Sequence, residues 1–226
     1  MTDPRPLEEA LAQRVLVLNA TAANPAWDAA FSPNLNLTHP GLVKDWSAEL
    51  LRAGADILEA NSYGADPFTA AEYGATESQR REWSRAAVSI AREANADHER
   101  YIAGVVGPSF DLLSLNARHS FHEHVEAFSE QIHELWAAGV DAIHLVHQPD
   151  SKNLCAALDA VARVEDEVAA RIPVIITFDL TPLGIIVSGE RPEDLSDIWE
   201  HRSVIGIGLA TYGYGGETLR RLRDRT

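Results

Sequence analysis

The sequence predicts an α/β fold of TIM-barrel-like (β/α) type, cut to about six strand–helix units. Short apolar runs alternate with longer amphipathic stretches, which is the pattern of a parallel sheet with crossover helices. Two of the helical stretches end in a Gly-x-Asp turn before the next apolar run, at residues 54–56 and 139–141. No low-complexity linker or break in composition interrupts the 226 residues. We therefore expect residues 1–226 to form a single domain.

Each expected strand is a short apolar run that stops at turn residues. The strands cover residues 14–19, 56–61, 101–106, 142–147, 173–178 and 204–209. The amphipathic stretches between them predict helices at residues 39–53, 77–96, 121–138, 152–170 and 191–200, with a last one from 216 to 225. A closed barrel of this type has eight units, so six indicate either an open doubly wound sheet or a barrel without its last quarter.

The composition excludes several classes of partner. A formal net charge of −15 argues against binding to nucleic acid or to an anionic membrane surface. The first residues have no apolar core of the kind a signal peptide needs, and no stretch is apolar enough to cross a bilayer. The single cysteine, Cys155, rules out an internal disulfide. These features lead us to expect a cytoplasmic protein.

The end of the second expected strand carries the most informative polar residues. Glu59 and Asn61 are two residues apart, so a strand places both on one face. A carboxylate and an amide at the end of a buried strand are costly unless they bind something. The pair therefore predicts either a ligand site or a hydrogen-bonded turn.

The histidines and the cysteine allow two interpretations each. His119, His122 and His124 lie within six residues and could hold a metal, but the acidic helix that they open favours a solvated or hydrogen-bonded role. His144 and His147 flank the end of the fourth strand and are expected on opposite sides of it. Cys155 lies on an apolar helix face, which is typical of a small core residue, although its place early in the helix would also suit a nucleophile.

Several segments together resemble one family over roughly residues 14 to 210. The clearest is Ala53-Gly-Ala-Asp-Ile-Leu-Glu-Ala-Asn-Ser-Tyr-Gly-Ala65, which follows Leu35-Asn-Leu-Thr-His-Pro-Gly. Further matches lie at residues 71–74, 103–109, 128–131, 138–141 and 150–153, and at Thr177-Phe178. In their order and spacing they resemble the homocysteine S-methyltransferase family, which includes betaine-dependent enzymes and the homocysteine domain of cobalamin-dependent methionine synthase.

The resemblance implies a (β/α)₈ barrel that binds homocysteine through zinc. In the family, three cysteine thiolates hold the metal, one at the end of the sixth strand and a pair at the end of the eighth. Zinc lowers the pKa of the substrate thiol, so the sulfur attacks the methyl donor as a thiolate.

This sequence departs from the family pattern at the metal. Where the family has Gly-Leu-Asn-Cys in the sixth strand, this chain reads Gly208-Leu-Ala-Thr211, and the paired cysteines have no counterpart. The first-strand Asp-Gly reads Asn19-Ala20, and Val146 replaces a glutamate, whereas Glu59, Asn61, Asp150 and Asn153 match. We therefore predict no cofactor and no metal ligand; zinc would need non-cysteine ligands or a partner chain.

The predicted function is methyl transfer to a small thiol or amino-acid-like substrate without the zinc–thiolate site. The resemblance implies substrate binding by Glu59 and Asn61, helped by Asn19, the backbone near Gly107, and Thr177. No residue is predicted as the catalytic base. The alternatives are a non-catalytic binding or regulatory subunit, or one half of a split methyltransferase. In each case a homo-oligomer or a partner protein is expected to cover the open barrel edges.

Overall fold

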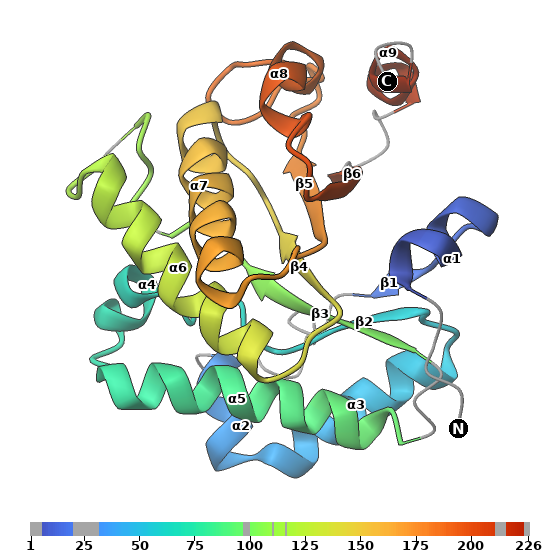
Figure 1. Cartoon of the computed structure of the whole chain (residues 1–226), viewed down its shortest axis with the longest axis vertical. Coiled ribbons are helices and arrows are strands. Elements are labelled where there is room, and N and C mark those ends of the chain that lie inside the picture. Colours follow the sequence, from blue (N-terminus) through green and yellow to red (C-terminus); the bar gives the residue numbers. More distant parts are fainter. Residues whose placement is uncertain are drawn as a thin grey trace. The chain divides into compact units, whose positions relative to one another are not determined.

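The computed structural model describes residues 6–19, 32–96, 100–109, 111–115, 117–210 and 216–223. The chain divides into two compact units, and Figure 1 labels the helices and strands along the chain. Unit 1 comprises residues 1–106 and 131–143, and unit 2 comprises residues 107–130 and 144–226. Among the described residues, no helix is long and apolar enough to cross a membrane.

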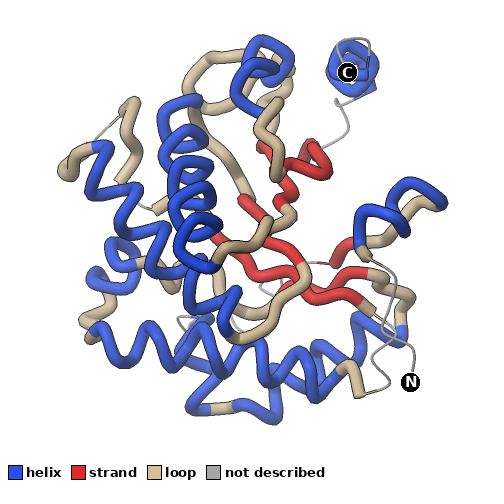
Figure 2. The backbone as a smooth tube through the Cα atoms, in the orientation of Figure 1, coloured by secondary structure: helices blue, strands red, loops and turns tan. Residues whose placement is uncertain are grey.

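Unit 1 contains three parallel strands with helices between them. Register pairs Leu18 with Ile57 and Ile57 with Tyr101, so neighbouring strands are also consecutive in the sequence. Strands β2 and β3 are buried along their whole length, and α3 and α5 pack on one another (Figures 1 and 2). The elements are α1 (Leu7–Gln13), β1 (Leu18–Asn19), η3 (Ser32–Asn34), α2 (Leu35–Thr38), α3 (Pro40–Arg52), β2 (Ile57–Glu59), α4 (Pro67–Glu72), α5 (Glu77–Ala94) and β3 (Tyr101–Val106).

Unit 2 contains a second parallel pair, β5 and β6. Register runs from Val174 opposite Val204 to Asp179 opposite Ala210, with one irregularity after Val174. Two elements belong partly to each unit, α6 (Phe121–Ala137) and β4 (Ala142–Leu145). The others in unit 2 are α7 (Ser151–Val168), β5 (Val174–Asp179), η4 (Pro192–Leu195), α8 (Ser196–Trp199), β6 (Val204–Ala210) and α9 (Gly216–Arg223).

The Gly-x-Asp turns link each helix to the next strand, as predicted. Gly54 and Gly139 have φ of 106° and 92°, a left-handed conformation that a side chain would strain. Asp56 accepts the Val17 N–H at 3.0 Å, and Asp141 accepts the Ile102 N–H at 2.7 Å. Each aspartate therefore satisfies a backbone donor at the start of the neighbouring strand.

Asp56 also pairs with Arg14 across a distance of 2.9 Å. The hydrogen bond from Arg14 lowers the pKa of this carboxyl group, against the opposing effect of burial.

Glu165 joins α7 to the strands that follow it in unit 2. Its carboxylate accepts hydrogen bonds from Ile172 N at 2.7 Å, Ser203 Oγ at 2.5 Å and Arg202 Nη2 at 2.8 Å. Burial raises the pKa of Glu165, but these donors outweigh it and leave the pKa lowered. An ionised carboxylate thus stabilises the turn into β5.

All six predicted strands are present, and β3 has the predicted bounds. Prediction missed four short helices before β3, namely α1, η3, α2 and α4, and placed one helix where η4 and α8 follow one another. These pieces have too few residues for helical periodicity to be visible in the sequence. Within each unit, strands that are consecutive in sequence pair with one another, as in a barrel and unlike a doubly wound sheet, whose strand order reverses.

Candidate functional site

The end of β2 in unit 1 buries the polar pair that the sequence singled out. Glu59 is 4% exposed and Asn61 is 2% exposed. The Asn61 amide donates to Ser32 O at 2.8 Å and to Asn36 Oδ1 at 2.9 Å, while its oxygen accepts from Ser32 Oγ. Asn61 therefore holds the η3–α2 segment, which lies 25–29 residues earlier in the chain, rather than the turn that follows β2.

Two further residues complete this network, and sequence reasoning had not singled them out. Asn36 Nδ2 donates to Asn61 O at 2.8 Å and to Trp83 O at 3.1 Å. Gln131 Nε2 donates to Ser62 O at 2.8 Å, and Ser62 Oγ in turn donates to Val105 O at 2.8 Å. Both residues lie in segments that match the family pattern, but only their burial shows that they belong to this network.

The predicted substrate-binding residues are divided between the two units. Asn19, Glu59 and Asn61 belong to unit 1, and Gly107 and Thr177 to unit 2. Asn19 ends β1, but its side chain lies outside the described part of the chain, as does Thr211. Gly107 is buried directly after β3, and Thr177 Oγ1 in β5 lies 3.2 Å from His144 Nε2.

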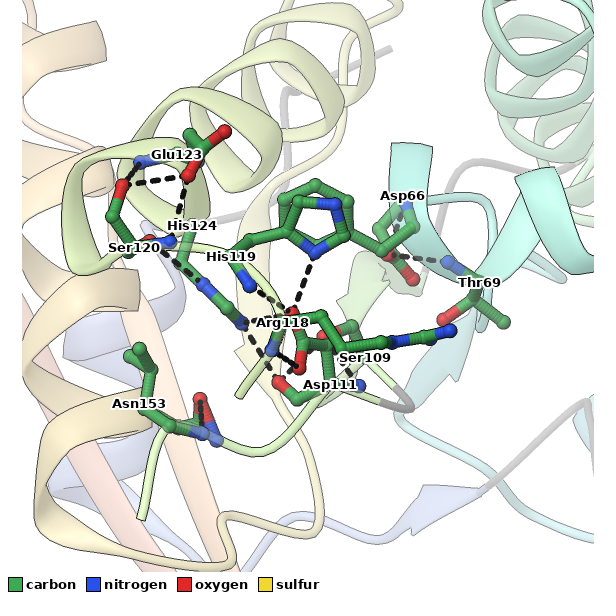
Figure 3. Close-up of polar contacts among 12 residues, drawn as sticks. Asp66, Thr69, Ser109, Asp111, Arg118, His119, Ser120, Glu123, His124 and Asn153 are labelled. Atoms are coloured by element: carbon green, nitrogen blue, oxygen red, sulfur yellow. Dashed lines mark hydrogen bonds and ion pairs between the residues drawn. The ribbon is translucent and has the colours of Figure 1, made fainter. Parts of the chain in front are cut away.

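The loop between β3 and α6 is organised around a buried aspartate. Figure 3 shows the loop side chains gathered at Asp111, which is fully buried. Its carboxylate accepts from Arg118 N at 2.6 Å, from His119 N at 2.9 Å and from His119 Nδ1 at 2.6 Å. Burial raises the pKa of Asp111, but the Arg118 N–H and the His119 donors outweigh it and lower the pKa. The carboxylate is therefore ionised and supports the loop.

His124 is a buried member of the same cluster. Its Nε2 lies 2.7 Å from Asp111 O, and its Nδ1 lies 3.0 Å from Ser120 O. Since carbonyl oxygens only accept, both contacts are hydrogen bonds when the ring carries both protons. Of the two expected roles, solvated or hydrogen-bonded, His122 has the first, since it is 75% exposed beside Glu126, and His124 has the second, since its side chain is 0% exposed.

These contacts assign hydrogen-bonding roles to His119 and His124. In the described residues, no three His, Cys, Asp or Glu side chains are grouped so that they could hold a metal ion.

Asp150 and Asn153, which match the family pattern, lie at the start of α7. Asp150 Oδ1 accepts the Asn153 N–H at 2.7 Å and caps the helix, where a carboxylate also meets the positive end of the helix dipole. Asn153 Oδ1 accepts from Leu113 N and Asp150 Oδ2 from Ser114 N, both at 3.4 Å. The two residues therefore join the β3–α6 loop to α7.

A second histidine–carboxylate pair lies at the strand ends of unit 2. His147 follows β4, and its Nδ1 lies 2.9 Å from Oδ1 of Asp179, the last residue of β5. The two side chains are 48% and 49% exposed. In barrel enzymes the residues that follow strand ends form the active site. His147 and Asp179 thus form an exposed titratable pair at strand ends of this unit, and the prediction of substrate residues did not include them.

The chain's own sulfur chemistry does not fit the three-thiolate zinc site of the family. Cys155 is the only cysteine in the sequence and lies within α7, where it is partly buried. Burial, followed by the charges of Asp159, Glu190 and Asp150, raises the pKa of its thiol. A protonated thiol is neither a zinc ligand nor a nucleophile at neutral pH, so the core interpretation of Cys155 is favoured.

Comparisons with known proteins give a consistent picture. The family model for homocysteine S-methyltransferase matches residues 7–212. The metallated form of the homocysteine methyltransferase MmuM from Escherichia coli is similar to this chain with a TM-score of 0.82 at 20% identity, over 98% of this chain and 84% of that chain. Its apo form gives a TM-score of 0.76 at 20% identity, over 98% and 82%. This chain therefore has a TIM-barrel-like α/β fold and belongs to the homocysteine S-methyltransferase family.

Proposed function

We propose that this protein transfers a methyl group to the sulfur of a small thiol, with homocysteine or a similar amino-acid thiol as acceptor. The observation that carries the proposal is the family match over residues 7–212. Glu59 supports it, because a buried carboxylate at a barrel strand end is suited to the ammonium group of an amino acid.

Direct binding of homocysteine tests the acceptor. We expect calorimetry to show binding to the wild type and at least about tenfold weaker binding to Glu59→Gln, since a charge-assisted hydrogen bond contributes about 1.5–3 kcal/mol. Glu126→Gln is the matched control, because Glu126 is a half-exposed glutamate on α6. Equal binding by all three proteins would remove Glu59 from the site.

Activity is tested with the same proteins. Homocysteine is incubated with S-methylmethionine, S-adenosylmethionine or betaine, and methionine is measured. Methionine formation by the wild type that falls in Glu59→Gln supports the proposal. If the protein binds homocysteine but forms no methionine with any donor, the result supports the non-catalytic alternative.

The sequence has one cysteine, whereas the family's zinc site uses three. Two alternatives to a complete enzyme therefore remain: a binding or regulatory subunit without catalysis, and one half of a split methyltransferase. In the split enzyme a partner chain would bring the zinc ligands that this chain does not have. Elemental analysis of the purified protein tests whether the isolated chain holds zinc by itself. Stoichiometric zinc in the isolated chain would contradict both the split enzyme and the metal-free mechanism.

Assembly is the last part of the proposal. β6 is partly exposed along its length, whereas β2 and β3 are buried. Strands of parallel sheets are normally covered on both faces, so we expect a second copy or a partner protein to cover β6. Light scattering of the purified chain checks this: a monomer at micromolar concentration would rule out the homo-oligomer.

A further inference from the structure

The backbone of His147 is held in a conformation that costs free energy. Its φ is 54°, in the left-handed region that non-glycine residues occupy at a cost of about 1–2 kcal/mol. In the described chain, Ala169 is the other non-glycine residue with positive φ, and it caps the C-terminus of α7, where this conformation is usual. His147 ends no helix. Residues strained in this way are concentrated at functional sites.

One hydrogen bond holds the backbone beside His147, and another orients its ring. The next residue, Gln148, donates its N–H to Thr177 O at 2.9 Å, which ties the chain to β5. The ring Nδ1 lies 2.9 Å from Asp179 Oδ1. A carboxylate only accepts, so Nδ1 donates, and the neutral ring then has its lone pair on Nε2.

The ion pair with Asp179 does not by itself account for this strained conformation. Half-exposed ion pairs contribute about 0–1 kcal/mol, which does not offset the backbone strain. A carboxylate that orients an imidazole through Nδ1 is, however, the arrangement that enzymes use to prepare Nε2 as a base.

We infer that His147 is the base that removes the proton from the acceptor thiol, and that Asp179 is its positioning residue; this inference rests on the proposed function. Nε2 takes the S–H proton and leaves a thiolate. The thiolate attacks the methyl carbon of a methylsulfonium donor, and the new S–C bond forms as the donor C–S bond breaks. The bonding electrons stay on the donor sulfur, and the imidazolium releases its proton to solvent.

The chemistry needs such a base. An ordinary thiol has a pKa of about 8.5 and is only a few per cent ionised at pH 7. An ordinary imidazole titrates near pH 6.5, so it accepts protons efficiently at neutral pH. His147 would thus supply the sulfur activation that the family's zinc provides.

The test compares His147→Gln, Asp179→Asn and a control, His122→Gln, in the methionine-forming assay over a range of pH. His122 also faces a carboxylate, Glu126 at 3.3 Å, but on the surface of α6. We expect His147→Gln to lower kcat about 10²- to 10⁴-fold at neutral pH with little change in KM. The loss should shrink at alkaline pH, where solvent ionises the thiol, and a merely structural defect would not do so.

Asp179→Asn should lower kcat less and shift the pH profile, and Asp179→Glu should restore part of the activity. An active wild type with His147→Gln equal to His122→Gln at every pH would overturn the inference and leave the proposed function standing.

Ultraviolet absorbance of the homocysteine thiolate gives a readout that does not depend on methyl transfer. A thiolate signal at neutral pH with the wild type but not with His147→Gln supports the base, even if no donor is used. The absence of that signal with an inactive wild type overturns both proposals.

Discussion

Two histidine–carboxylate pairs of unit 2, Asp111 with His119 and Asp179 with His147, have the same chemical parts and opposite surroundings. Asp111 and His119 are 2.6 Å apart with the carboxylate fully buried, whereas His147 and Asp179 are 2.9 Å apart with both side chains about half-exposed. The Asp111 carboxylate also accepts two backbone N–H groups. Burial and backbone bonding thus commit the first pair to holding a loop. The second pair is accessible, and its backbone strain makes a role in chemistry the better explanation.

The largest expected difference between the pairs is in stability. We expect Asp111→Asn to lower the free energy of unfolding by about 2–4 kcal/mol, because the buried donors lose a charged acceptor. Asp179→Asn should change it by less than about 0.5 kcal/mol, since exposed pairs contribute little. Urea denaturation measures both. Similar losses in the two variants would remove the distinction between the pairs.

Acid pH should test the stabilising role of the Asp111 carboxylate directly. The pKa of Asp111 is lowered in the folded protein, so its contribution is complete above the ordinary value of about 4 and is lost as pH falls through the lowered value. The wild type should therefore lose stability below about pH 4, and its advantage over Asp111→Asn should shrink there. Urea midpoints measured at descending pH check this. An advantage that is constant down to pH 2 would show that the carboxylate charge is not responsible.

Gly208, which lies opposite Thr177 where β6 pairs with β5, gives an intermediate effect. A Cβ on Gly208 would lie 2.8 Å from Thr177 Cγ2, and rotation of Thr177 away from it would break the contact between Oγ1 and His144. We expect Gly208→Ala to cost about 1–3 kcal/mol through overpacking. The double variant with Thr177→Ala should recover part of that loss, which a double-mutant cycle measures. If the changes in unfolding free energy of the two single variants simply add, the strain does not come from the contact between residue 208 and Thr177.

The smallest effect should have the opposite sign. We expect His147→Gly to raise the free energy of unfolding by up to about 1 kcal/mol, because relief of left-handed strain exceeds the entropy cost of glycine. Ala169→Gly, at the left-handed cap of α7, is the matched control and should behave similarly. Thermal denaturation of both variants measures this. Destabilisation by His147→Gly alone would mean that the ring itself supports the fold.

Local patterns predicted the framework well. The turns at Gly54 and Gly139 were recognisable because a glycine past a helix and an aspartate before a strand act within a few residues. The apolar runs gave all six strands. The short helices α1, α2 and α4 were missed, since pieces of this length owe their stability to tertiary packing.

The candidate site was predicted less completely. The sequence drew attention to Glu59 and Asn61, but the partners of Asn61, Ser32 and Asn36, come from a segment about 25–29 residues earlier in the chain. The helical pattern around His122 left open whether His124 is solvated or hydrogen-bonded. Its burial against Asp111 depends on how the preceding loop folds back.

The sequence by itself determined the order of strands and helices, the turn chemistry, the single cysteine and the resemblance to the family, because each depends on residue types at short spacing. Only the tertiary structure decided which polar side chains are occupied by the fold and which are accessible. It buried Asp111 and His124, satisfied Asn61, and left His147 beside Asp179 on a strained backbone. The reason is physical: the role of a titratable group depends on its burial and its partners, and both are set by residues distant in the chain.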